Sequence, residues 1–380
     1  MQIAFIVQGE GRGHLTQAIS MAQILQSNGH TVSNVLVGTN RGVDLPDFFI
    51  GKFPTAKSFM SPNLVFDKKS NKLCLRKTLR KNLAKAKYYI KSLRFISDEM
   101  KTNKPDLIIN FYEGLGGIYN YFYNNRNIPV IAVAHQYLLL NKSFIHPEGS
   151  WFHRTLVNFN SRITALGAEK KLTLSFTPFP DNFQDQLFTV PPLIRQEVTA
   201  AGPVQKREDF LLAYVNQSAL ANELIAWHNE NEETIIHCFI TELPTKVLHS
   251  NLVFHSLNAP LFLSYMRRCK GVVSTAGFET ICEAMYLEKP VLLIPLKNHY
   301  EQRCNALDAV RAGAGMTQKD FNLTPFLKFI EEGYTPNVGF AAWVSSAEEV
   351  ILNELEAFEP KEQTEIDKPY QFSPQDLSFE

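Results

Sequence analysis

Gly271-Val-Val-Ser-Thr-Ala-Gly277-Phe-Glu279-Thr-Ile-Cys-Glu283-Ala-Met-Tyr is the most informative stretch of this chain, and Lys289-Pro-Val-Leu-Leu-Ile-Pro-Leu and Glu301-Gln302-Arg-Cys-Asn305-Ala follow it. The first part predicts a buried apolar strand, a turn of small residues and a helix. The second part is apolar throughout, as expected for a central strand of a parallel sheet, which is buried on both faces. The stretch therefore predicts an α/β fold.

The turn and the start of the following helix suit a diphosphate. Thr275, Ala276 and Gly277 let a phosphate approach the backbone, and the helix presents free N–H groups and the positive end of its dipole there. Glu283 lies further along the helix, within reach of a ribose whose phosphates sit at the helix start. Two polar residues follow the carboxyl end of the next strand, where they would read sugar hydroxyls: Glu301 and Gln302. Together these residues predict a nucleotide-sugar site.

The amino terminus gives an independent second signal. Residues 2–7 are apolar, Gln8-Gly9-Glu10-Gly11-Arg12-Gly13-His14 follows, and apolar residues then recur at helical spacing up to Gly29. This order predicts a strand, a glycine loop and a helix. The glycines match a dinucleotide-binding loop only loosely, because the third comes one residue early and no acidic residue ends the next strand.

The two segments resemble the GT-B glycosyltransferases, in particular glycosyltransferase family 28 and the UDP-glycosyltransferases. The resemblance implies two Rossmann-like, doubly wound parallel-sheet domains that face each other across a cleft. It also implies that Glu283 binds the ribose and that Glu301 and Gln302 bind the donor sugar. The diphosphate contacts that it implies are Thr275, Ala276, Gly277, Phe278, Glu279 and Thr280.

The chain departs from many of these relatives at the turn. They carry His-Gly-Gly and an Asn two residues beyond, whereas this chain has Thr275-Ala276-Gly277 and Glu279. A carboxylate one turn from a diphosphate is repulsive. We therefore expect the side chain of Glu279 to turn back and cap the helix, in a capping-box-like arrangement.

His14 is the candidate catalytic residue. In the resembled families the glycine loop lies between donor and acceptor, and a neutral imidazole can take a proton from an attacking hydroxyl near pH 7. The alternative is that His14 caps the helix or donates a hydrogen bond to phosphate. Three further loop residues are assigned to this region: Gly11, Arg12 and Gly13, of which Arg12 would balance phosphate charge or lie on the surface.

Further polar residues follow other expected strands. Glu113 comes after a strand that ends at Asn110, and His135 with Gln136 comes after a strand that ends at Ala134. Both segments resemble acceptor-side loops, although they are also compatible with polar residues that close βα turns. Asn216 and Ser218 correspond to a loop that contacts the donor phosphate or the acceptor.

The whole chain supports a two-domain protein. It has 380 residues, 45% of them hydrophobic, and a net charge of zero, which gives no general field for nucleic acid. Its five cysteines are scattered and without C-x-x-C spacing, which argues against disulfides or a zinc site and favours a cytoplasmic location. We see no signal peptide and no apolar run long enough to span a bilayer.

Apolar strand candidates alternate with helical segments along the chain, which predicts parallel sheets with right-handed crossovers. The candidates are Ile3–Val7, Val32–Val37, Leu107–Asn110, Val130–Ala134 and Leu187–Val190, then Phe210–Val215, Thr234–Phe239, Leu252–Phe254, Val272–Ser274 and Val291–Ile294. We expect an acceptor-side domain at 1–195 and a donor-binding domain at 205–343. A helix at 344–358 would pack back on the first domain, and 359–380 would form a disordered tail.

Residues 68–94 carry a strong local positive charge. They include eleven lysines and arginines and no acidic residue. Six apolar residues recur at helical spacing and would face the core: Leu75, Leu79, Leu83, Ala86, Ile90 and Leu93. A basic amphipathic helix predicts docking on anionic lipid, with each cation contributing roughly 1 kcal/mol. The alternatives are a solvated helix face or a site for an anionic soluble acceptor.

These observations predict a glycosyltransferase that moves a sugar from a nucleotide-sugar, most simply a UDP-sugar, to a hydroxyl of a lipid-linked or glycan acceptor. We expect neither cofactor nor metal, because the sequence has no Asp-x-Asp; the resemblance implies inversion at the anomeric carbon. The expected location is the cytoplasm, peripheral on the inner face of the membrane if the acceptor is a lipid. Two alternatives are a UDP-N-acetylhexosamine 2-epimerase and a non-catalytic sugar-nucleotide-binding protein.

Overall fold

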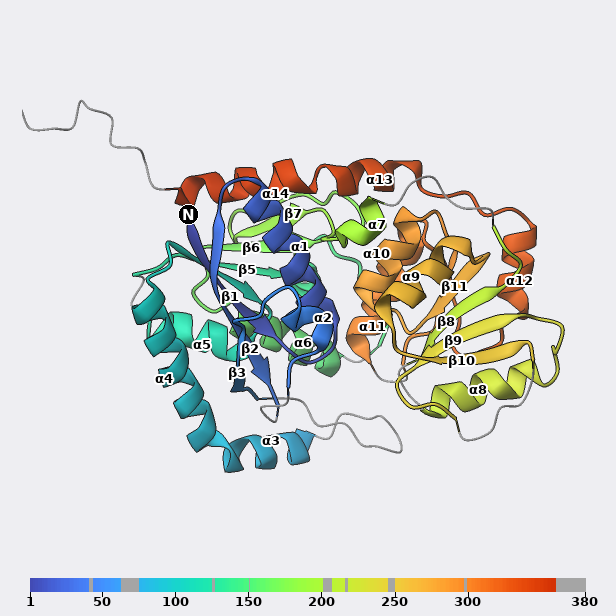
Figure 1. Cartoon of the computed structure of the whole chain (residues 1–380), viewed down its shortest axis with the longest axis horizontal. Coiled ribbons are helices and arrows are strands. Elements are labelled where there is room, and N and C mark those ends of the chain that lie inside the picture. Colours follow the sequence, from blue (N-terminus) through green and yellow to red (C-terminus); the bar gives the residue numbers. More distant parts are fainter. Residues whose placement is uncertain are drawn as a thin grey trace, which may run out of the picture.

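The computed structural model describes residues 1–40, 44–62, 75–124, 127–149, 151–200, 207–215, 218–244, 250–296 and 299–359. They form two parallel sheets, each flanked by helices (Figure 1). The strands of the first sheet are β1 (Gln2–Gln8), β2 (Thr31–Thr39), β3 (Lys57–Met60), β4 (Leu107–Phe111), β5 (Val130–Ala134), β6 (Lys170–Leu174) and β7 (Leu187–Val190). Those of the second are β8 (Leu211–Val215), β9 (Ile236–Ile240), β10 (Leu252–Ser256), β11 (Gly271–Ser274), β12 (Val291–Leu293) and β13 (Gly315–Thr317).

The helices alternate with these strands. The first half contains α1 (Gly13–Ser27), α2 (Asp47–Ile50), α3 (Leu75–Ala84), α4 (Ala86–Asn103), α5 (Gly114–Phe122), the 3-10 helix η1 (His135–Leu140), α6 (Trp151–Thr164) and α7 (Gln196–Thr199). The second contains α8 (Ser218–His228), α9 (Ala259–Arg268), α10 (Phe278–Tyr286), α11 (Tyr300–Arg311), α12 (Thr324–Glu331), α13 (Val338–Ser345), α14 (Ala347–Leu355) and η2 (Glu356–Phe358).

Strand order explains where a ligand would bind. The first sheet runs β3-β2-β1-β4-β5-β6-β7 and the second β10-β9-β8-β11-β12-β13, with every strand pairing parallel. The direction of winding reverses between β1 and β4 and again between β8 and β11. Ligands of open α/β sheets bind beyond the carboxyl ends of the strands at such switch points. The glycine loop after β1 lies at the switch point of the first sheet, and the small-residue turn after β11 lies at the switch point of the second.

The central strands are buried on both faces, as their sequences predict. In β1, Ile3, Phe5 and Val7 belong to one apolar cluster, whereas Ala4 and Ile6 belong to another on the opposite face. Such two-sided burial is typical of parallel sheets that are covered by helices on both sides. The predicted pair of doubly wound parallel-sheet units is thus confirmed.

All ten predicted strands are present, and three more were missed. β3 and β13 are short edge strands of four and three residues, which give too little apolar pattern to be recognised. β6 begins with Lys170 and Lys171, whose amines bond to Glu354 and to the backbone oxygen of Asp185. Lysine stems can cover apolar surface while their charged ends find polar partners, so the strand is hidden by its charges.

The prediction for the basic helix is wrong in two respects. The segment forms two helices, α3 and α4, which are separated at Lys85. Leu79, Leu83 and Ile90 are 63%, 66% and 46% exposed, so they do not face the core. Ala86 is exposed as well, whereas Leu93 is buried as predicted. The other buried residues of the two helices include Thr78, Tyr89, Ser92 and Ile96, because α4 packs on the sheet through a different face and α3 buries little. Lys68, Lys69, Lys72 and the side chain of Leu75, which belong to the same prediction, lie outside the described residues.

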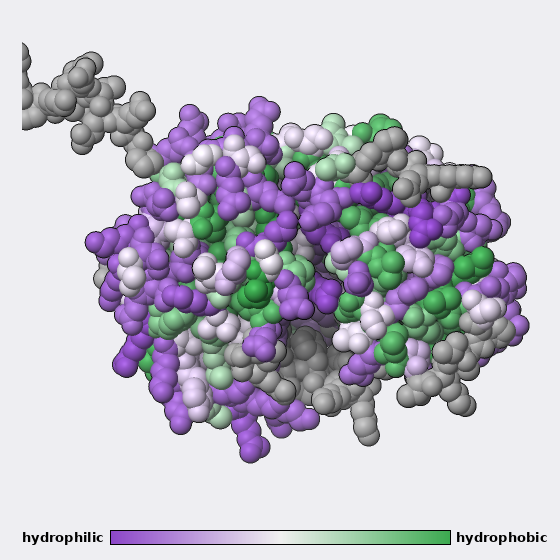
Figure 2. Space-filling model, in the orientation of Figure 1, coloured by the Kyte–Doolittle hydropathy of each residue, from purple (hydrophilic) through white to green (hydrophobic). Residues whose placement is uncertain are grey.

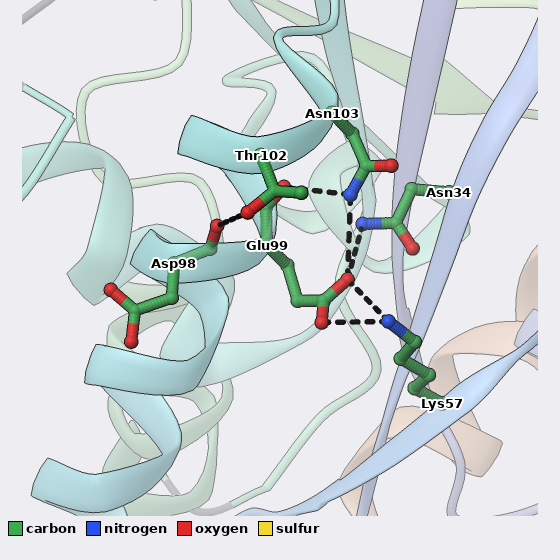
Figure 3. A network of polar contacts seen from close by, with 6 residues as sticks. All are labelled: Asn34, Lys57, Asp98, Glu99, Thr102 and Asn103. Carbon is green, nitrogen blue, oxygen red and sulfur yellow. Dashed lines mark hydrogen bonds and ion pairs between the residues drawn. The ribbon is translucent and has the colours of Figure 1, made fainter.

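A polar network holds α4 against the edge of the first sheet (Figure 3). Lys57 of β3 donates to both oxygens of Glu99 at 2.7 and 2.9 Å. Asn34 of β2 donates to the same carboxylate at 3.3 Å. Neighbouring Thr102 and Asn103 bond within the helix. The network fixes α4 against β2 and β3, so the exposed Tyr88 and Ile90 belong to an anchored helix.

The last helices return to the first sheet, along the top of the view in Figure 1. Trp343 of α13 donates to the backbone oxygen of Ser175 at 3.0 Å. On α14, Glu354 pairs with Lys170 at 2.7 Å and Glu348 accepts from Asn28 at 2.9 Å. These contacts link the end of the chain to β6, to α1 and to the segment after β6. The proposed tail from residue 360 onward lies outside the described residues.

Candidate functional site

A cavity of about 250 Å³ lies between the two lobes, where Figure 2 shows the surface hollowed. Its walls come from the glycine loop and α1 of the first lobe and from the ends of β8, β9 and β11 and the starts of α9 and α10 of the second. Eight of the residues predicted for the site line it: Arg12, Gly13, Thr275, Gly277, Glu279, Thr280, Glu283 and Gln302. The structure thus brings together the two sequence segments that were singled out independently.

The turn after β11 has the geometry of a strained ligand loop. Ala276 is fully buried at φ 61°, a left-handed conformation that non-glycine residues seldom adopt. Asn305 holds it by donating to the backbone oxygen of Ala276 at 3.1 Å. Gly277 is the N-cap of α10 and has no side chain to occupy the helix start. Such strain is maintained where the surrounding structure supports a function.

Glu283 forms a two-pronged ion pair that the sequence did not reveal. Arg195 donates to its two oxygens, from Nε at 2.6 Å and from Nη2 at 2.8 Å. Both residues line the cavity, and Glu283 is only 4% exposed. A bidentate pair fixes the plane of the carboxylate. The sequence does not mark Arg195 as a site residue, because its partner lies 88 positions further along the chain and leaves no local pattern.

Glu279 does not cap α10 as predicted. Its carboxylate accepts from its own backbone N–H and crosses to the first lobe, where Nε2 of Gln17 donates to Oε1. Burial raises the pKa of Glu279 to about 7. A Cβ on Gly13 would lie 2.5 Å from Oε2 of Glu279, so only glycine leaves room for this contact. The carboxylate thus stays at the first turn of α10 and links it to α1 of the first lobe.

His14 lies in the first turn of α1 and is 8% exposed. Its Nδ1 lies 3.0 Å from Oε1 of Gln17, and its ring stacks on Tyr112, with centroids 5.4 Å apart. Tyr112 itself adopts φ 57° at the end of β4. Burial lowers the pKa of His14 from its ordinary value, so the ring is neutral near pH 7.

Glu301 and Gln302, the two residues predicted to bind the donor sugar, have different partners. Gln302 lines the cavity, and its Oε1 accepts from the backbone N–H of Leu296 at 2.8 Å. Glu301 accepts from Nε2 of Gln136 at 2.9 Å, a bond between α11 and η1. An acceptor-side residue and a donor-side residue are therefore in direct contact across the lobes.

His135 and Glu113 occupy packing positions outside the cavity lining. The ring of His135 stacks on Phe278 with centroids 4.0 Å apart, and its Nδ1–H donates to the backbone oxygen of Leu174 at 2.7 Å. Burial lowers the pKa of His135 to about 4. Glu113 is the N-cap of α5, where it accepts from the N–H of Leu115 at 3.0 Å and from Ser61. Burial raises the pKa of Glu113 to about 7.

The remaining loop predictions have mixed outcomes. Gly11 adopts φ 79° in the glycine loop, a conformation that requires little strain only in glycine. Arg12 lines the cavity and lies 5.6 Å from the ring centre of Phe48. Asn216 and the side chain of Ser218 lie outside the described residues.

An aromatic wall was also missed. Phe262 of α9 packs edge-on against Tyr214 and Phe239, with centroids 5.8 and 5.2 Å apart, and all three line the cavity. Tyr214 and Phe239 lie near the carboxyl ends of predicted strands, which was the available signal. An aromatic wall of this kind suits the apolar face of a nucleobase.

The fold and the cavity define a two-domain α/β enzyme of the GT-B type, with a ligand site at the junction of the lobes. The family model of glycosyl transferase family 1 matches residues 1–332. The chain belongs to this family, and it is a glycosyltransferase.

Solved structures of glycosyltransferases share the fold over nearly the whole chain. The glycotransferase of kitacinnamycin is similar with a TM-score of 0.61 and 14% identity, over 94% of this chain and 99% of that one. UGT89C1 of Arabidopsis thaliana complexed with quercetin is similar with a TM-score of 0.60 and 13% identity, over 94% of this chain and 98% of that one. MurG of Acinetobacter baumannii is similar with a TM-score of 0.54 and 14% identity, over 94% of this chain and 100% of that one. No curated protein sequence matches. The resemblance to family 28 and to UDP-glycosyltransferases is confirmed.

Proposed function

We propose that the protein transfers a sugar from a UDP-sugar to a hydroxyl of a lipid-linked or glycan acceptor, without a metal and with inversion at the anomeric carbon. The observation that carries the proposal is the cavity that joins the glycine loop to the start of α10 and to Glu283. Among the structural relatives, LpCGTa is in complex with UDP, and UGT2 of Phytolacca americana is complexed with UDP-2fluoro-glucose and pterostilbene. Those ligands belong to the relatives, and they support a UDP donor here.

We assign each part of the donor to a group of lining residues. The diphosphate lies against the turn after β11, where Thr275 and Thr280 offer hydroxyls and α10 its positive end. Arg12 adds a positive charge from the opposite wall. The ribose hydroxyls donate to Glu283, and the base lies on the aromatic wall. The sugar then points towards Gln302.

The leaving diphosphate needs stabilisation as negative charge develops on it. Preorganised N–H groups, hydroxyls and a helix dipole supply this in a partly enclosed site. Within the described ranges, no three His, Cys, Asp or Glu side chains gather as a candidate metal site. The proposed chemistry is therefore assigned to the dipole, the hydroxyls and Arg12.

His14 is assigned the role of general base. Its ring is neutral near pH 7, and the glycine loop that precedes it borders the cavity. An acceptor hydroxyl that loses its proton to His14 attacks the anomeric carbon, and the bond to the diphosphate breaks on the opposite face. One direct displacement of this kind inverts the configuration.

A screen of UDP-, GDP- and dTDP-sugars by thermal shift tests the donor assignment. We expect UDP-sugars to raise the melting temperature most, since a ligand at 100 times its Kd stabilises a protein by about 2.7 kcal/mol. Product analysis with lipid-linked and glycan acceptors then tests transfer. Formation of an epimer from donor alone would make the protein an epimerase, whereas binding with neither hydrolysis nor transfer over a broad acceptor panel would make it a sensor.

The surface of α3 and α4 favours a lipid-linked acceptor. Leu79, Leu83, Tyr88 and Ile90 are exposed apolar residues. The exposed cations between and around them are Arg76, Lys77, Arg80, Lys81, Lys87, Lys91 and Arg94. Apolar residues that insert beside lysines and arginines are typical of helices that lie on anionic bilayers. None of the helices described here is both long and apolar enough to cross a membrane. We assign this surface to peripheral docking on anionic lipid, on the cytoplasmic side.

Vesicle sedimentation tests the docking surface. We expect binding to vesicles that contain anionic lipid at low salt, weaker binding at high salt because salt screens charges, and little binding to neutral vesicles. L79S/L83S should reduce the bound fraction several-fold. Phe183→Ser is the matched control, because Phe183 is 75% exposed in a different loop. Absence of binding at every salt concentration would remove membrane docking from the proposal.

A further inference from the structure

Three side chains form a hydrogen-bonded chain across the junction of the lobes. Nδ1 of His14 lies 3.0 Å from Oε1 of Gln17, and Nε2 of Gln17 donates to Oε1 of Glu279. His14 and Gln17 belong to α1 of the first lobe, whereas Glu279 belongs to α10 of the second. His14 and Gln17 are buried, with 8% and 2% of their surfaces exposed.

We propose that Gln17 and Glu279 are positioning residues that hold His14 in one tautomer, with the proton on Nδ1 and the lone pair on Nε2. This inference rests on the proposed role of His14 as the base and adds the groups that prepare it. It also assigns a role to the acidic residue that departs from the resembled families at the diphosphate turn.

The chemistry of the three groups fixes the direction of each bond. A carboxylate only accepts hydrogen bonds, so the partner of Glu279 must be the amide NH₂ of Gln17. The amide oxygen of Gln17 then faces His14, and an oxygen can only accept there. Nδ1 of His14 must therefore carry the proton, which leaves Nε2 as the basic nitrogen.

Glu279 is needed because an amide can be reversed. Without a carboxylate to receive its NH₂ group, Gln17 can present that group to Nδ1 of His14. A donor facing Nδ1 favours the other tautomer, with the proton on Nε2, and a ring in that state cannot take a proton there. An incorrect tautomer of the base is costly: in the serine protease triad it lowers kcat by about 10⁴-fold.

The local structure is shaped to receive Glu279. A Cβ on Gly13 would clash with the carboxylate, as noted above, so the glycine loop lets the second lobe approach closely. Burial raises the pKa of Glu279 to about 7, so the ionised carboxylate, which can only accept and fixes this direction, prevails above pH 7. The contact makes the state of His14 depend on the approach of α10 to α1. The base is thus prepared only when the donor-binding lobe is in place.

Steady-state kinetics of variants provide the first test. Gln17→Leu and Glu279→Ala should lower kcat by about 10²-fold or more, because they release the tautomer of the base. The KM for the donor should change little. Glu279→Gln should retain clearly more turnover than Glu279→Ala, since its amide oxygen can still accept from Gln17. Melting temperatures check that each variant is folded.

Nitrogen-15 NMR of the histidine rings provides a test that needs no activity. The signals of His14 are assigned by their loss in His14→Asn. We expect protonated Nδ1 and bare Nε2 in the unchanged protein and in E279Q, and a shift towards protonated Nε2 in Q17L and E279A. Protonated Nε2 in the unchanged protein, or an unaltered tautomer in both Q17L and E279A, overturns the inference. Absence of transferase activity would refute the proposed function, whereas the inference on the tautomer of His14 would still be decided by the NMR result.

Discussion

Replacing His14 by alanine should lower kcat by about 10²–10⁴-fold, the usual contribution of a general base. The Kd for UDP should stay within a few-fold, because His14 does not line the donor cavity, and its contacts are with Gln17 and Tyr112. Initial rates at saturating donor and acceptor give kcat, and calorimetric titration with UDP gives the Kd. His153→Ala on α6 is the matched control and should leave both quantities unchanged.

The pH profile separates the two roles considered for His14. Burial lowers the pKa of His14, so its neutral form persists below the ordinary value of about 6.5. The acid limb of kcat/KM should therefore lie below pH 6.5, and the same limb should disappear from the residual activity of H14A. Undiminished turnover in H14A would end its role as base. An equal fall in UDP affinity and turnover would instead show that the ring donates a hydrogen bond to phosphate.

The sequence alone predicts those features of the fold and the site that depend on the pattern of neighbouring residues. A few consecutive residues are enough to predict the ten strands, the glycine loop and the small-residue turn at Thr275–Gly277, since burial and turn geometry restrict residue type locally. Side-chain partners are different. Gln17 and Glu279 are 262 residues apart in the chain, and Gln136 and Glu301 are 165 apart. These pairs meet only because two domains fold and dock.

The same limit explains the error at the basic helix. Helical spacing at Leu79, Leu83 and Ile90 correctly indicates an apolar stripe, but periodicity alone does not say whether protein or something else covers it. The sheet selects the face with Tyr89, Leu93 and Ile96. The leucine stripe is left on the outside, next to the cations. The departure from the expected core is thus what gives the surface its proposed lipid-binding character.

Arg195 shows why a binding residue can look like a linker. It follows the Pro191-Pro192 turn, where sequence composition signals only a chain reversal. Its guanidinium nonetheless bonds to Glu283 on α10, the residue that we propose as the ribose acceptor. A charged residue at the junction of two lobes has no periodic neighbours that could mark its role, so it becomes visible only in the folded protein.

Replacing Glu283 by alanine should weaken UDP binding by about 10–150-fold, because hydrogen bonds to a charged group contribute about 1.5–3 kcal/mol. The ribose loses its acceptor, and Arg195 keeps its charge without a partner in a largely buried place. Removing one member of a buried pair also costs up to about 3–5 kcal/mol of stability, so the melting temperature should fall as well. Calorimetric titration with UDP at fixed salt measures the first effect, and a thermal melt measures the second.

The double variant E283A/R195A separates binding from stability. Removing both charges should recover part of the melting temperature, because no unpaired charge remains, whereas UDP affinity should stay low since the ribose still lacks its acceptor. Glu332→Ala serves as control, because the side chain of Glu332, at the end of α12, is 66% exposed and pairs with Lys328 at 3.6 Å. If E283A retains full UDP affinity, the ribose does not bind at Glu283, and the placement of the whole donor along α10 is wrong.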